Sequence, residues 1–305
     1  MTRVSDISSH ALMLSSLNRS IDGARTLQVQ ISTGKVGSQY SDIGRDSQRL
    51  VSLEGERSRT SQFIQNNKTV DLRLQEMETV VAQMTELASD AKALFVNAAH
   101  HQNASDLDIQ SSMRNMLESV GGLLNTEQNG RSLFSGGLTD VLAVNFDNLP
   151  ADGEFGADTA DLTYYNGDDQ VLRHRASDTL SVDYGVTAAD PAFEKLVRGL
   201  KIAQTVDFSD PEGARQRIDR GLELINEALQ DLPDVRGRIG GARAVLEKET
   251  FRMEDFQIAL DESIGNIENV DLAEAISRLS EQEAQMQASL AALSRLRQVS
   301  LANFL

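Results

Sequence analysis

Proline occurs at only four positions in this chain of 305 residues, namely 150, 191, 211 and 233. The first 149 residues and the last 72 contain none. Because proline removes a backbone donor and clashes with the preceding turn, it interrupts helices. The two outer parts of the chain can therefore form long helices, whereas the middle is divided into shorter elements.

A heptad pattern in the first half predicts one long helix over 46–101. Nine successive a and d positions are apolar, which is typical of a coiled coil. They are Val70, Leu74, Met77, Val81, Met84, Ala88, Ala91, Phe95 and Ala98. At about 1.5 Å per residue such a helix is roughly 80 Å long. We expect a turn at 97–105 and then a partner helix that ends at Gly121-Gly122 or at Asn129-Gly130.

Helical patterns return after position 190. Asp190 and Asp210 each precede a proline, which is the order of an N-cap followed by the first helical residue. Two apolar stripes follow, at 218–229 and at 239–267, and Glu249 interrupts the second. Asp271, with Glu274 three residues later, predicts the capped start of a terminal helix. We interpret the glycines at 237–241 as small residues that let helices approach closely.

The segment 136–190 differs from the rest of the chain. It has eleven acidic and two basic side chains, a net charge of −9, within a total of −17. Three short runs, 162–165, 171–174 and 180–184, have the composition of strands, and Asn166-Gly167 predicts a hairpin turn between the first two. We expect a small β-rich insertion with a solvated acidic surface.

Composition and motifs argue against several classes of function. The charge of −17 disfavours nucleic-acid binding and docking to an anionic membrane. No apolar run approaches the roughly 18 residues of a membrane span, so we expect no membrane insertion. The adjacent pair His100-His101 lacks metalloprotease spacing, and Thr33-Gly34-Lys35 lacks the other residues of a phosphate loop. We expect no catalytic residue, no cofactor and no metal site, and the chain is not predicted to be an enzyme.

Both ends of the chain carry apolar stripes at helical spacing. Two isolated helices leave most of their apolar sides in water, so these stripes indicate burial against other molecules. The candidate assembly and chaperone interface consists of Leu14, Leu17, Ile21, Ile31, Leu272, Ile276, Leu279, Met286, Leu290, Leu293, Leu301, Phe304 and Leu305.

The same ends resemble a known family. Residues 15–35, which end in Ser32-Thr33-Gly34-Lys35, resemble the start of the bacterial flagellin superfamily. Residues 267–277 and the apolar ending 301–305 resemble its C-terminal signature, and 236–246 resembles the stretch that enters its long C-terminal helix. The first residues and the segment 130–136 are more similar to the hook-associated branch of the superfamily than to filament flagellin.

This resemblance implies a structural subunit of the bacterial flagellum that joins hook to filament. It implies secretion through the flagellar export apparatus, assembly with other copies and with adjacent hook-associated protein and flagellin subunits, and a cytoplasmic export chaperone on the C-terminal helix. Filament flagellin remains the first alternative. A cytoplasmic coiled-coil adaptor remains the second.

The expected fold is mainly α: an elongated bundle of long antiparallel helices, with paired N- and C-terminal coiled-coil arms and a small β-rich insertion at the far end. The arms are predicted at 1–45 plus 265–305. A long-helix rod is predicted at 46–135 plus 190–264, and the outer insertion at 136–189.

Overall fold

A computed structural model describes residues 2–100, 106–150 and 159–302. The chain divides into two compact units: unit 1 contains residues 1–59 and 256–305, and unit 2 contains residues 60–255. The mainly α class, with long antiparallel helices, a paired first and last helix and small two-stranded sheets, is confirmed. The three-part division of the chain stays a prediction.

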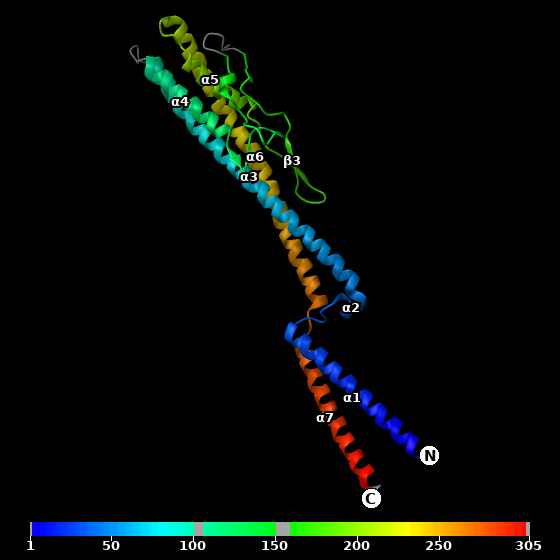
Figure 1. Cartoon of the computed structure of the whole chain (residues 1–305). Coiled ribbons are helices and arrows are strands. Elements are labelled where there is room, and N and C mark those ends of the chain that lie inside the picture. The colour runs from blue at the N-terminus through cyan, green and yellow to red at the C-terminus, as the bar shows by residue number, and fades with distance from the viewer. Residues whose placement is uncertain (1, 101–105, 151–158, 303–305) are drawn as a thin grey trace. The chain divides into compact units, whose positions relative to one another are not determined.

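Unit 1 pairs α1 (Thr2–Thr33) with α7 (Leu272–Ala302), which lie side by side in Figure 1. Between α1 and the long helix α3 (Ser47–His100) lie a short helix, α2 (Tyr40–Ile43), and a 3-10 turn (Gly44–Asp46). The turn before α2 is held by Asp42, whose carboxylate accepts hydrogen bonds from the backbone N–H groups of Ser38 and Gln39, at 3.1 Å each.

Unit 2 is built on α3 and α6 (Pro211–Glu268), with α4 (Asp106–Leu124) and α5 (Pro191–Gln204) packed against each other beside them (Figure 1). The predicted heptad residues of α3 lie in its core: seven are at most 1% exposed, and Val70 and Ala98 pack against them. The long helix, predicted at 46–101, is therefore confirmed over its described length. The predicted turn at 97–105 was wrong for 97–100, which still belong to α3, and its remaining residues 101–105 lie outside the described ones.

The glycines that allow close packing are not those at 237–241. A Cβ at Gly237, Gly240 or Gly241 would meet nothing within 4 Å, so that interpretation was wrong. At Gly221 of α6, a Cβ would lie 2.6 Å from the ring of Phe95 on α3. Phe256, predicted to belong to the core stripe of 239–267, is 42% exposed.

The β structure consists of two small hairpins, both in unit 2. Strands β1 (Glu127–Gln128) and β2 (Arg131–Ser132) pair across Asn129-Gly130, where both residues have positive φ, 53° and 72°. These are the dihedrals of a tight hairpin turn. Helix α4 has already ended at Leu124, close to the Gly121-Gly122 alternative.

The second hairpin pairs β3 (Leu172–Arg175) with β4 (Ser181–Tyr184), so two of the three predicted strand runs form strands. The run 162–165 does not. Asp161 accepts hydrogen bonds from the backbone and hydroxyl of Thr163 and starts a turn there, and the Tyr164 hydroxyl is buried against the carbonyl of Ala188. Gly167 serves close packing, because a Cβ there would lie 2.3 Å from the Tyr165 hydroxyl.

Candidate assembly interface

The terminal helices are joined at a compact backbone crossing in unit 1. Gly34, at φ 70°, ends α1, and its carbonyl accepts a hydrogen bond from Val270 N at 2.9 Å. Val36 N donates to the Glu268 carbonyl at 2.7 Å, and Lys35 Nζ lies 2.6 Å from the Glu268 carboxylate. Asp271 caps α7 as predicted, accepting from Ala273 N and Glu274 N. This crossing joins the C-terminal end of α1 to the N-terminal end of α7 and so fixes one end of the helix pair.

Between α1 and α7 lies a seam with heptad spacing. The α1 side chains that are half-buried along it are Met13, Leu17, Ser20, Ala24, Leu27 and Ile31. On α7 the corresponding side chains, buried or half-buried, are Ala275, Leu279, Gln282, Met286, Ser289 and Leu293. Alternating steps of three and four residues place each set on one helix face, as in a coiled coil.

The seam is loosely buried. Among the side chains of unit 1 that the structure describes, only Leu50, Leu260 and Ala275 are apolar and buried. Gly23 approaches the amide of Gln282, to which a Cβ would come within 3.1 Å, so part of the contact is polar. The pair is therefore held mainly by its crossing and by partly exposed side chains.

A second set of apolar side chains lies outside the seam. Leu14 and Ile21 on α1 are 42% and 39% exposed, and Leu272, Ile276 and Leu290 on α7 are 48%, 52% and 52% exposed. The structure therefore divides the predicted interface into two groups. Leu17, Ile31, Leu279, Met286 and Leu293 take part in the helix pair, whereas the five exposed residues flank the seam.

Sequence reasoning missed some members of both groups. Met13 and Leu27 continue the heptad of Leu17 and Ile31, so that register could have found them. Leu12 and Val29, at 69% and 49%, are further exposed apolar side chains of α1. Leu301 lies in α7, but its side chain is not among those described, and Phe304 and Leu305 lie outside the described residues.

The segment 130–136 is one link between the insertion and the helices of unit 2. The carbonyl of Ser132 accepts a hydrogen bond from Arg73 Nη2 of α3 at 2.6 Å. Phe134 is fully buried and meets Phe193 of α5 edge to face, with ring centroids 5.9 Å apart. Gly136 has φ 71° and adjoins the Asp168 carbonyl, so a side chain there would be strained.

Across the described part of the chain, no helix has the length and apolar character to cross a membrane. Within those same residues, no three His, Asp or Glu side chains come together in a way that could hold a metal ion.

Two family models match this chain and together span most of it. The bacterial flagellin N-terminal helical region matches residues 4–139, and the bacterial flagellin C-terminal helical region matches residues 222–305. The chain belongs to the bacterial flagellin family. It is therefore a structural component of the bacterial flagellum and not an enzyme, and as a flagellin-family subunit it polymerises with other flagellar components.

The fold of this flagellin-family chain is also that of solved flagellar hook-associated proteins. A putative flagellar hook-associated protein from Vibrio parahaemolyticus aligns at 18% identity and TM-score 0.61, covering 75% of this chain and all of the other. FlgL from Bacillus cereus aligns at 16% and 0.53, covering 70% and 98%. Flagellar hook associated protein-3 from Legionella pneumophila aligns at 12% and 0.57, covering 72% and 98%. The search of curated proteins gave no match.

Proposed function

We propose that this flagellin-family chain is the subunit that joins hook to filament, and that it polymerises through the exposed faces of α1 and α7. Assembly through these faces is supported by five apolar side chains that are 39–52% exposed beside the seam, namely Leu14, Ile21, Leu272, Ile276 and Leu290. Apolar surface of this kind is stabilised when a neighbouring helix removes it from water, by about 25 cal/mol for each Å² buried.

The junction role, as opposed to that of filament flagellin, is supported by the fold. The chain covers 98–100% of three solved proteins whose descriptions name hook association or FlgL. The resemblance of segment 130–136 to that branch agrees, and this segment forms a defined hairpin and buried anchor in unit 2. The partners would then be copies of the same chain, the adjacent hook-associated protein and flagellin, with the acidic insertion facing outward.

Immunolabelling of isolated flagella tests the junction role. A single band where the hook meets the filament is the expected result. Label along the whole filament would instead establish the filament-flagellin alternative. Absence of the chain from sheared flagella would favour the second alternative, a cytoplasmic coiled-coil adaptor.

Paired substitutions test the assembly surface separately. Changing Ile276 and Leu290 to Asp places charges on the exposed face of α7, so we expect the chain to be lost from flagella while its helicity and the core of unit 2 remain. The matched control changes Leu279 and Met286, which lie in the seam, to Asp as well. This control should loosen the α1–α7 pair itself. If the Ile276/Leu290 variant assembles normally, this face is not an assembly surface.

The chaperone that we expect on α7 would use the same exposed residues before export. A cytosolic pull-down with the Ile276/Leu290 variant should lose a partner that the unaltered chain retains. Retention of that partner by the variant would place the chaperone contact elsewhere.

A further inference from the structure

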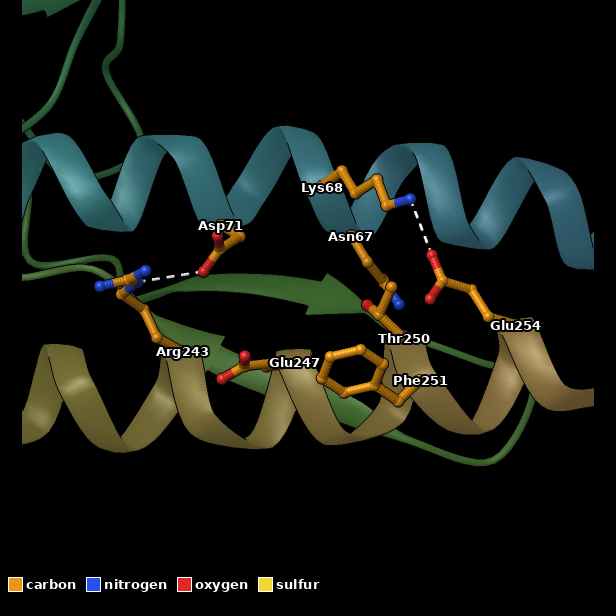
Figure 2. Close-up of a pocket in the computed structure, with 8 residues that line it drawn as sticks. All are labelled: Asn67, Lys68, Asp71, Arg243, Glu247, Thr250, Phe251 and Glu254. Atoms are coloured by element: carbon orange, nitrogen blue, oxygen red, sulfur yellow. Dashed lines mark hydrogen bonds and ion pairs between the residues drawn. The ribbon is translucent and has the colours of Figure 1, made fainter.

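Unit 2 has a hollow between α3 and α6, on the side that faces the viewer in Figure 2. Its volume is about 190 Å³, several times the roughly 30 Å³ that one water occupies in the liquid. Figure 2 shows the β3–β4 hairpin passing behind the two helices, so the hairpin covers the opposite side of the pair. The ring of Phe251 on α6 borders the hollow and is 59% exposed.

The charges around the hollow are unequally matched. Lys68 Nζ lies 2.7 Å from the Glu254 carboxylate, and Arg243 Nε lies 3.0 Å from that of Asp71. Both cations are thus already paired across the helices. Glu247, one turn before Phe251 on α6, is exposed, and the described residues provide no ion pair or side-chain hydrogen bond for it.

An exposed aromatic ring beside an unpaired carboxylate is suited to an arginine. The planar guanidinium can stack on the ring while its N–H groups donate to the carboxylate. A lysine ammonium could supply the charge, but it lacks the planar guanidinium with its paired N–H donors. The chemistry of the hollow therefore selects a partner that presents an arginine side chain.

Unit 2 itself presents such a side chain on its other flank. Arg131 is exposed at the β1–β2 turn, and in the described part of the chain it has no ion pair or side-chain hydrogen bond. The carbonyl of its neighbour Ser132 is bound by Arg73 of α3. Arg73 follows Asp71 by two residues, which is about 200° around the helix and about 3 Å along it. Arg131 and the hollow thus lie at similar heights on opposite flanks of α3.

We infer that the hollow lined by Glu247 and Phe251 receives Arg131 of a neighbouring copy of this chain. Two complementary patches on opposite flanks at one height form a heterologous contact, and repetition of such a contact joins copies side by side, in a ring if the rotation closes and in an open helical array if it does not. The inference rests on the proposed function only in that the chain polymerises with copies of itself. It adds a lateral contact between unit 2 domains to the contacts of the terminal helices.

Cysteine cross-linking tests this contact, because the chain has no cysteine of its own. In cells that carry the double variant Arg131→Cys/Glu247→Cys, a short bismaleimide applied to isolated flagella should join successive copies. The expected result on a denaturing gel is a ladder of dimers, trimers and larger products. Either single-cysteine variant can join at most two chains, so neither should give a ladder.

The matched control is Arg131→Cys/Val245→Cys. Val245 is 43% exposed and precedes Glu247 by two residues, so it points away from the hollow. A ladder of equal strength from this control overturns the inference. The inference is also overturned if the Arg131→Cys/Glu247→Cys variant gives no ladder although an immunoblot shows that it is present in flagella. A cross-link from position 247 to a different flagellar protein would overturn it as well.

A charge exchange gives a second readout. Arg131→Glu and Glu247→Arg should each lower the amount of the chain retained on sheared flagella, and the double exchange should restore it. Failure of the double exchange to restore retention contradicts the pairing. Immunolabel along the whole filament would overturn the junction role but leave the cross-linking result unaffected, so the two proposals fail separately.

Discussion

Asn67 of α3 is a fully buried amide that holds the β3–β4 hairpin against the helix. Its Nδ2 donates to the carbonyl of Ala176 at 3.1 Å, and its Oδ1 lies 2.7 Å from His174 Nε2. Because the amide nitrogen donates, the amide oxygen accepts, so His174 carries its proton on Nε2. Burial lowers the pKa of His174, which keeps the ring neutral at physiological pH.

We expect Asn67→Ala to lower the free energy of unfolding by about 1–3 kcal/mol, because it leaves the buried Ala176 carbonyl and the half-buried His174 ring without their partner. The neighbouring Asn66→Ala is the control, since Asn66 is exposed. Urea unfolding of both variants measures the difference. Equal losses would show that the amide contributes nothing beyond helix propensity.

Glu78 joins α3 to α6 through two arginines. Its carboxylate lies 2.8 Å from Arg243 Nη1 and 3.1 Å from Arg236 Nε. Hydrogen bonds from Arg243 and then Arg236 hold the pKa of Glu78 below its usual 4.5. This contribution to stability is therefore complete above pH 4.5 and is lost as the pH falls through the lowered pKa of the folded state.

Replacing Glu78 by Gln should lower stability at pH 7 by up to about 1 kcal/mol, the range of partly exposed ion pairs. It should also make the melting temperature fall less steeply than in the unaltered chain as the pH drops below 4.5. Melting curves between pH 3 and pH 7 measure this, with the exposed Glu76→Gln as control. Parallel pH profiles for Glu78→Gln and the unaltered chain would contradict the assignment.

At the scale of elements, glycines with the same open surroundings have opposite roles. Gly130 and Gly241 both have free space where a Cβ would be. Gly130 has φ 72° in the β1–β2 turn, so Gly130→Ala should cost about 1–2 kcal/mol from backbone strain alone. Gly241 lies within α6, so Gly241→Ala should stabilise the chain by about 0.5–1 kcal/mol. Thermal unfolding of both variants should show shifts of opposite sign.

Helices were predictable because their signal is repeated many times. Nine apolar positions fix the face of α3, and Asp190-Pro191 and Asp271 mark the starts of α5 and α7. The strand predicted at 162–165 was wrong, although the composition of this run is strand-like. The Asp161 side chain starts a turn there, and the Tyr164 ring is buried. The close approach at Gly221 depends on a Phe95 ring that is distant in sequence, and no local pattern contains that information.

The apolar stripes of α1 and α7 can be read from the sequence, but the sequence does not tell which of their residues lie in the α1–α7 seam and which are exposed beside it. Leu290 and Leu293 are three residues apart on α7 and equally apolar, yet Leu290 is 52% exposed and Leu293 lies in the seam. Their difference depends on the rotation of α7 relative to α1. The crossing near Gly34 and Val270 sets this rotation, and it joins residues more than two hundred positions apart.

For the whole molecule, the two units should differ in stability. Unit 2 holds a continuous core from Leu74 to Leu246, whereas the described side chains of unit 1 include three buried apolar residues. We expect residues 60–255, expressed alone, to unfold cooperatively near the melting temperature of the full chain. Hydrogen exchange in the full monomer should be fastest in α1 and α7. Slower exchange there than in α4 and α5 would contradict this order.

The Lys35–Glu268 ion pair joins residues separated by 233 positions. About three quarters of the polypeptide is thus the loop that must close before the first and last helices can meet. Loop closure costs entropy before any contact offsets it, and folds with distant contacts form slowly. A chain emerging one end first therefore cannot pair its terminal helices until its last thirty or so residues arrive, so this pairing completes folding and cannot begin it.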